Sequence, residues 1–199
     1  MSHMSSHTST TGPSSDTLGV ILRRRSIRRF RPDQISDSDL ERIVEAGLWA
    51  PSAMNQQQWH FTVVQSKDLL TRLAEGIKKK LLISGIEHLA ERARTPGYSP
   101  LHGAPTVIVI SAGAHAPWIQ IDCGAAAENM ALAAEALGIG SCLMAMPGLL
   151  FASDEHGQWS KELGFPDGYS HMITVALGYR EGDSPPPRPR RPDVVGYVR

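Results

Sequence analysis

The stretch DCGAAAENMALAAEALGIGSC, residues 122–142, decides how the rest of the chain can be arranged. Its apolar and small residues predict one long helix over residues 117–137, ended by Gly138. Because most of its side chains are small, another helix can approach its surface closely. The sequence therefore predicts that this helix lies in the middle of the fold or at a subunit interface.

Apolar segments before and after this helix predict the strands of one small sheet. APTVIVISAG (104–113) and HMITVALGY (171–179) are apolar throughout, which is typical of buried strands. WHFTVVQ (59–65) alternates in polarity, and SCLMAM (141–146) is also expected to be a strand. With the intervening helices, this order predicts an α+β fold: a small mixed central sheet flanked by helices. No GxGxxG follows a strand, so the pattern does not fit a Rossmann domain.

Further helices have clear starting signals. Ser36 caps a helix that follows it, with an acidic residue three positions later, and Ser66 starts another with Leu73 and Ile77 on its inner side. A short helix is expected over residues 153–163. The C-terminal segment from Pro185 begins as an extended chain, and its last apolar residues could add a strand to a sheet edge.

The composition is that of a single soluble domain. The chain has 199 residues, 20 basic and 20 acidic side chains, and 41% hydrophobic residues. No apolar run approaches the roughly 20 residues that cross a bilayer. Residues 1–16 are rich in Ser, Thr and His and are expected to be a disordered tail without a signal peptide, followed by one domain over residues 17–199.

The cysteines and histidines predict neither a disulfide framework nor a metal site. Cys123 and Cys142 lie among small apolar residues, so buried free thiols are expected, which favours a reducing cytoplasm. The eight histidines have no metal-ligand spacing.

RRRSIRRF, residues 23–30, concentrates positive charge in an otherwise neutral chain. Arginines at the end of a helix can cap its carbonyl groups or simply be solvated. A phosphate site is the alternative, because guanidinium groups match phosphate oxygens and Arg24 and Arg28 are four residues apart. A nucleic-acid groove is disfavoured, since no aromatic residues are interleaved with the arginines.

Three other segments have the residue types of a ligand site, although each also fits an ordinary loop or turn. PSAMNQQQWHF (51–61) is dense in amides, which both donate and accept hydrogen bonds. GIGSCLMAMPGLL (138–150) combines small residues with a Pro-Gly pair, which lets backbone groups approach a flat ring. In the extended C-terminal segment, Arg188 and Arg190 are two residues apart and point the same way.

Taken in order, these motifs resemble the nitroreductase family of flavin-dependent oxidoreductases over almost all of the chain after residue 17. RRRSIRRF resembles its opening Arg-Arg-Ser motif, and APSAMNQQQWHF its Pro-Ser…Asn-x-Gln-Pro-Trp-x-Phe motif. DCGAAAENMALAAEALGIGSC is similar to its central helix. GYREGDSPPPRPRRP resembles its closing segment.

The resemblance implies the nitroreductase fold, FMN as cofactor, and a homodimer with two equivalent sites at the interface and a C-terminal tail that extends to the partner. It implies no metal and no side chain acting as nucleophile or acid. The implied cofactor-binding residues fall into four groups: Arg24, Arg25, Ser26 and Arg28 for phosphate and ribityl; Arg188 and Arg190 closing on the phosphate; Pro51, Ser52, Ala53, Asn55 and Gln57 from the partner's loop; and Pro147, Gly148 and Leu149 against the ring.

The resemblance also implies the chemistry. NADH or NADPH would supply hydride, and a small aromatic or conjugated acceptor such as a nitroaromatic or a quinone would then be reduced on the same face, in ping-pong order. Residues 78–104 would cover the acceptor. Relatives that dehalogenate or oxidise rings are alternatives, and so is a flavin carrier without turnover. Neither a membrane nor nucleic acid is expected as a partner.

Overall fold

The computed structural model describes residues 17–113 and 117–199, so the expected tail over residues 1–16 lies outside the described residues. The elements in chain order are α1 (Thr17–Arg23), α2 (Asp37–Leu48), the short 3-10 turn Ala53–Asn55, β1 (Trp59–Val64), α3 (Lys67–Leu82), α4 (Glu87–Arg94), β2 (Thr106–Gly113), α5 (Ile119–Ala136), β3 (Gly140–Met144), α6 (Gly148–Phe151), α7 (His156–Glu162), β4 (Tyr169–Gly178) and the 3-10 turn Pro192–Val194.

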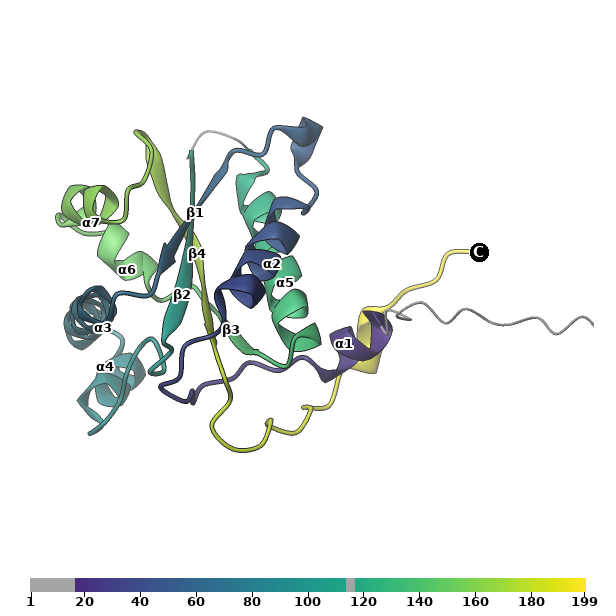
Figure 1. Cartoon of the computed structure of the whole chain (residues 1–199), viewed down its shortest axis with the longest axis horizontal. Coiled ribbons are helices and arrows are strands. Elements are labelled where there is room, and N and C mark those ends of the chain that lie inside the picture. The colour runs from purple at the N-terminus through teal and green to yellow at the C-terminus, as the bar shows by residue number, and fades with distance from the viewer. Residues whose placement is uncertain (1–16, 114–116) are drawn as a thin grey trace, which may run out of the picture.

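The four strands form one sheet in the order β1-β2-β4-β3. Helices α2 and α5 cover one face of this sheet, and α3, α4, α6 and α7 cover the other (Figure 1). The expected α+β fold is confirmed. It differs in one respect: every strand pair is antiparallel, and the one parallel pairing in the described residues is the isolated bridge Ser26–Ser141. A strand that is covered on both faces is apolar whether it runs parallel or antiparallel to its neighbours. The composition of these strands therefore does not reveal their direction.

The long helix α5 lies in the middle of the fold, as its small side chains predict. Cys123, Ala126, Ala127, Met130 and Ala134 are fully buried along it. Helix α2 crosses it so closely that a Cβ atom on Gly47 would overlap the end of the Met130 side chain. Glycine at this position therefore allows the close approach of the two helices.

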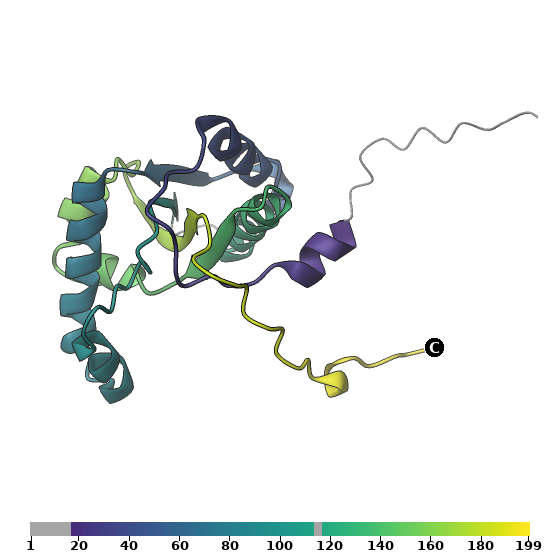
Figure 2. The same ribbon diagram turned by 60° about the horizontal axis from the view of Figure 1, so that its bottom comes forward.

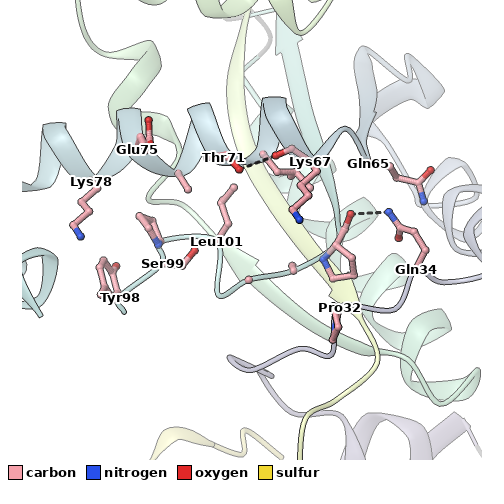
Figure 3. A pocket seen from close by; sticks show the side chains of 16 residues that line it. Pro32, Gln34, Gln65, Lys67, Thr71, Glu75, Lys78, Tyr98, Ser99 and Leu101 are labelled. Atoms are coloured by element: carbon pink, nitrogen blue, oxygen red, sulfur yellow. Dashed lines mark hydrogen bonds between the residues drawn. The ribbon is translucent and has the colours of Figure 1, made fainter. Parts of the chain in front are cut away.

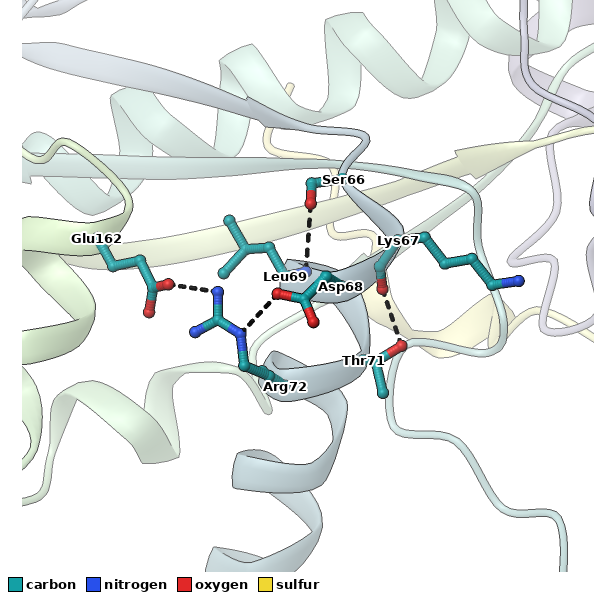
Figure 4. Close-up of polar contacts among 7 residues, drawn as sticks. All are labelled: Ser66, Lys67, Asp68, Leu69, Thr71, Arg72 and Glu162. Carbon is teal, nitrogen blue, oxygen red and sulfur yellow. Dashed lines mark hydrogen bonds and ion pairs between the residues drawn. The ribbon is translucent and has the colours of Figure 1, made fainter.

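Helix α3 begins at the expected cap, where the Ser66 hydroxyl accepts the Leu69 N–H at 3.3 Å. One turn later, Arg72 links α3 to α7. Its Nε donates to Asp68 at 3.0 Å, and its Nη2 forms an ion pair with Glu162 (Figure 4). The hydrogen bond from Arg72 lowers the pKa of Glu162 below its usual value.

We expect Arg72→Gln to lower the melting temperature slightly, because ion pairs near the surface stabilise weakly. A carboxylate whose pKa is lowered by folding contributes stability above its unfolded pKa, and this contribution is lost as pH falls through the lowered value. The difference in melting temperature between wild type and variant should therefore be present at pH 7, and it should shrink in acid and in high salt. A difference that is unchanged from pH 7 to pH 3 would contradict this role.

The C-terminal segment leaves the body of the protein after β4. Residues 181–199 are exposed, and both views show this segment running away from the sheet (Figures 1 and 2). The expected strand over its last apolar residues is not formed within the described chain. The segment contains a 3-10 turn at Pro192–Val194. Those residues, Val194, Val195, Tyr197 and Val198, have their side chains exposed.

Both thiols are as the sequence predicts. Cys123 and Cys142 are free and buried. Across residues 17–113 and 117–199, no helix is both long and apolar enough to cross a membrane.

Candidate functional site

The arginine stretch lies along strand β3, at the open edge of the sheet. Ser26 pairs with Ser141 in a parallel bridge, and the Ile27 N–H donates to the Ser141 carbonyl at 2.8 Å. A few residues later, the Arg31 N–H donates to the Tyr179 carbonyl at 2.8 Å. The sequence thus brings residues 26–31 against both β3 and the end of β4, although they belong to no helix or strand themselves.

The arginines of this stretch have different environments. Arg24 is half-buried, and its Nε donates to Glu128 of α5 at 3.2 Å, which leaves both Nη nitrogens without a partner among residues 17–113 and 117–199. Arg25 folds back, and its Nη1 donates to the Leu22 carbonyl at 2.7 Å, as expected for an arginine that caps a helix end. The Arg28 side chain is exposed, and its one hydrogen bond within the described part of the chain is a long one of 3.4 Å to the Ser26 carbonyl.

Three guanidinium groups lie near enough to the buried thiol of Cys142 for their charges to act on its pKa. Burial raises the pKa of Cys142, while the positive charges of Arg28, Arg24 and Arg92 and a hydrogen bond with Ser26 act to lower it. Burial, together with the positive charges of Arg28 and Arg92, lowers the pKa of His102 to about 4. We call Arg24, Arg28 and Arg92 the arginine cluster.

A cavity of about 330 Å³ lies beside this cluster. Ser26 and Arg28 line it from the N-terminal stretch, and Arg180 and Pro185 line it from the segment that follows β4. Arg188 and Arg190 lie a few residues further along the exposed C-terminal segment. The structure of one chain does not bring these two arginines to Arg24; a shared anion would require the segment to bend back or to reach another subunit.

Pro147, Gly148 and Leu149 lie beyond the other end of β3. Pro147 is the N-cap of α6, and Gly148 and Leu149 are its first residues, at a place where the sequence also fits a tight turn. A Cβ on Gly148 would lie 3.2 Å from the Nδ1 of His171, so glycine lets this turn sit closely on that ring. Burial lowers the pKa of His171 to about 4, and the imidazole is therefore neutral at pH 7. From Ser141, which pairs with Ser26, to the end of β3 at Met144 is roughly 10 Å at about 3.3 Å per residue, and Pro147 follows three residues later.

The loop over residues 51–57 lies at the N-terminal end of α5, where Ala53 contacts Asp122, whereas Arg24 contacts Glu128 in the middle of that helix. Met54, Asn55 and Gln57 all have positive φ angles, near 50°, which is uncommon for residues other than glycine. The Asp122 carboxylate anchors the loop by accepting the Ala53 N–H at 3.2 Å. Within one chain, this loop and the arginine cluster do not belong to the same site.

A comparison with protein families finds one match that spans most of the described residues. Residues 21–179 match the model of the nitroreductase family. This chain belongs to the nitroreductase family. That membership makes it an oxidoreductase, and it confirms the resemblance found in the motifs.

Individual relatives of this nitroreductase-family protein are also similar to it over most of its length. A protein of Archaeoglobus fulgidus, provisionally named NADH dehydrogenase/NAD(P)H nitroreductase, is 34% identical over 170 residues, which are 82% of this chain and 85% of the relative. A nitroreductase of Bacteroides fragilis solved with bound FMN has a TM-score of 0.86 and 35% identity over 94% of this chain and all of its own. A nitroreductase of Desulfitobacterium hafniense, also with bound FMN, has a TM-score of 0.84 and 36% identity over 92% and 98% of the two chains.

One residue near this site, Arg92, could not be found from the sequence. Arg92 belongs to α4, which the sequence did not define clearly, and it lies with its guanidinium 5.1 Å from the centre of the Tyr98 ring. The Tyr98 hydroxyl in turn contacts the Met146 sulfur at 3.6 Å, next to Pro147. The segment over residues 78–104 therefore reaches both the arginine cluster and the turn at Pro147.

Asp122 offers a test of how the loop over residues 51–57 is anchored. We expect Asp122→Ala to lower the free energy of unfolding by about 1–2 kcal/mol, because the Ala53 N–H loses its acceptor in a half-buried place. Urea unfolding measures this. Asp122→Asn keeps a side-chain oxygen that can accept the N–H and should recover much of the loss. If the two variants unfold alike, the hydrogen bond is not what holds the loop.

Proposed function

We propose that this protein is a cytoplasmic, homodimeric FMN-dependent oxidoreductase. It takes hydride from NADH or NADPH and reduces a small aromatic or conjugated acceptor, such as a nitroaromatic or a quinone, in ping-pong order. The observation that carries the proposal is the arrangement along β3, with guanidinium groups beside Ser26 at one end and the turn at Pro147 at the other. The FMN-bound relatives, similar over almost the whole chain, support the choice of cofactor.

The residues along β3 fit FMN in charge and in shape. Its phosphate carries roughly −1.5 to −2 charges, which the Nη nitrogens of Arg24 and the free end of Arg28 would match. The buried Ser141 hydroxyl has no hydrogen-bond partner among the described residues, and it lies on this same strand. A ribityl chain would follow β3 towards Pro147, Gly148 and Leu149, which would then lie against the flavin ring.

The remaining binding groups would come from a second copy of the chain. The loop at residues 51–57 would enter the partner's site with Pro51, Ser52, Ala53, Asn55 and Gln57, and Arg188 and Arg190 would close on a phosphate from the C-terminal segment. Large apolar side chains lie exposed where α2 ends and α5 begins, namely Leu48, Trp49, Met54, Trp118 and Ile121. An apolar patch of this kind is typical of a subunit interface.

FMN, when bound, would supply the hydride chemistry, and the protein would position it and control its surroundings. The arginine cluster would hold the anionic end and make the site positive. Neutral His171 under the turn at Gly148 would add no charge beside the ring. Tyr98 and its neighbours would exclude water from an acceptor above the ring, which favours flat apolar acceptors over charged ones.

Anaerobic titration of the FMN-loaded protein with NADH and with NADPH tests the proposal. We expect the absorbance of oxidised flavin, at about 450 nm, to bleach within seconds and to recover when a nitroaromatic or a quinone is added. A spectrum that neither nucleotide changes would instead favour a flavin carrier. Bleaching without recovery by either acceptor would point to another oxidant, and a panel including halogenated phenols would identify it.

A further inference from the structure

A second cavity lies away from the residues assigned to FMN. It is a groove of about 510 Å³ between helix α3 and the segment 98–105, which runs beside that helix before β2 begins (Figure 3). Known small-molecule sites have volumes of about 300–1,000 Å³, so the groove is large enough for a ligand. None of the residues expected to bind FMN lines it.

The segment 98–105 separates the groove from the arginine cluster. Tyr98 lines the groove, while its hydroxyl contacts Met146 and its ring lies under Arg92, on the side of the proposed FMN site. His102, in the middle of the segment, lies close enough to Arg28 and Arg92 for their charges to act on it. The groove and the 330 Å³ cavity therefore have no lining residue in common.

The middle of the groove is apolar, and most of its neutral polar groups are already paired. Leu70, Ala74, Leu101, Ala104 and Pro105 form its apolar part. The Gln34 amide donates to the Pro105 carbonyl at 2.9 Å, the Gln65 amide to the Thr106 hydroxyl at 3.1 Å, and the Thr71 hydroxyl to the Lys67 carbonyl at 2.8 Å. These bonds leave the charged side chains as the groups that can select a ligand.

The charges differ between the two ends of the groove. Lys78 lies near one end with Glu75 on the preceding turn, so that end carries both signs (Figure 3). Lys67 lies near the other end, and among the described residues no carboxylate pairs with it. The acids closest to Lys67 and Gln34 in sequence are engaged elsewhere: Asp68 with Arg72, and Asp33 with Arg31.

We propose that this groove is a binding site for a small amphipathic monoanion, distinct from the FMN site. The ligand is an aromatic or aliphatic molecule with one carboxylate or sulfonate group. Its anionic group binds Lys67, and its apolar body lies on Leu70, Ala74 and Leu101. Because the opposite wall is segment 98–105, occupancy also stabilises the segment that carries Tyr98.

Calorimetric titration of the FMN-loaded protein with naphthalene-2-sulfonate tests the site. We expect Lys67→Gln to weaken binding about three- to fivefold, the effect of one partly exposed ion pair. Lys79→Gln, on the exposed side of the same helix, should leave the affinity for the probe unchanged.

A second variant tests the place of binding. Ala74→Trp, which fills the groove, should abolish this binding event while leaving the FMN content unchanged. Neutral 2-naphthol should bind wild type more weakly and should not respond to Lys67→Gln.

Hydrogen exchange gives an independent readout. Saturating naphthalene-2-sulfonate should slow exchange of the amides of residues 98–104 in wild type but not in Ala74→Trp. Binding with unchanged affinity in both Lys67→Gln and Ala74→Trp would overturn the proposal, because the probe would then occupy another surface, such as the acceptor face of the flavin. The absence of any binding heat at millimolar probe would also overturn it.

Discussion

Replacing Arg24 with alanine should weaken FMN binding by about a hundredfold, because forked charge-assisted hydrogen bonds to a phosphate stabilise by about 3 kcal/mol. The structure gives Arg24 this role rather than one of general solvation. Its side chain is only 22% exposed, and Glu128 holds its Nε at 3.2 Å, so the two Nη nitrogens are oriented before a ligand arrives. Titration of the FMN-free protein, followed by quenching of flavin fluorescence, measures the dissociation constant.

The same stretch offers a matched control. Arg29 is 77% exposed and pairs with Glu181, and it is not among the residues expected to bind the phosphate. Arg29→Ala should therefore change the dissociation constant by no more than about fivefold. Arg24→Lys should fall between the two, since it keeps the charge but loses the planar fork. If Arg24→Ala and Arg29→Ala weaken binding equally, the stretch acts only through its overall charge.

Glu128 extends this test to the positioning of Arg24. Glu128→Gln keeps the size of the side chain but removes the negative charge from the ion pair with Arg24. Its effect on FMN binding should be smaller than that of Arg24→Ala, because the guanidinium remains and only its orientation is loosened. The comparison separates the charge of Arg24 from its placement.

The fold could be predicted where one local signal decides the structure. Small residues along 117–137 placed α5 in the interior, and Ser36 and Ser66 marked the starts of α2 and α3 because their hydroxyls cap the first turns. Strand direction could not be predicted, since a strand covered by helices on both faces is apolar whether it runs parallel or antiparallel. The short helix α6 was also missed, because four residues are too few for a periodic pattern.

The candidate site also has residues that the local sequence predicts and residues that only tertiary contacts bring into place. Arg24 and Ser26 belong to a motif that can be read from neighbouring residues. Arg92 approaches them only because α4 packs beside α3, a tertiary contact that leaves no signal in the eight residues of α4. The groove along α3 is likewise invisible in the sequence, because it depends on the distance between that helix and the segment 98–105.

The largest loss of stability should come from Ile77→Ala, about 3 kcal/mol in the free energy of unfolding, because it leaves a cavity in a closely packed interior. Ile77 is fully buried on the inner face of α3, where Leu73 and Leu81 are also buried. Packing at the preceding residue is already tight: a Cβ on Gly76 would lie 3.0 Å from the Leu150 side chain and 3.2 Å from the Trp159 side chain, so α6 and α7 have little freedom to move in and fill the space. Urea unfolding at fixed protein and FMN concentrations gives the value, since ligand binding and association both change apparent stability.

Two control variants test this explanation. Ile77→Val should lower the free energy of unfolding by only about 1 kcal/mol, and Leu82→Ala on the exposed side by still less. Equal losses for Ile77→Ala and Leu82→Ala would mean that α3 is held mainly by surface contacts such as Arg72–Glu162, and not by the face that the sequence marks as its core.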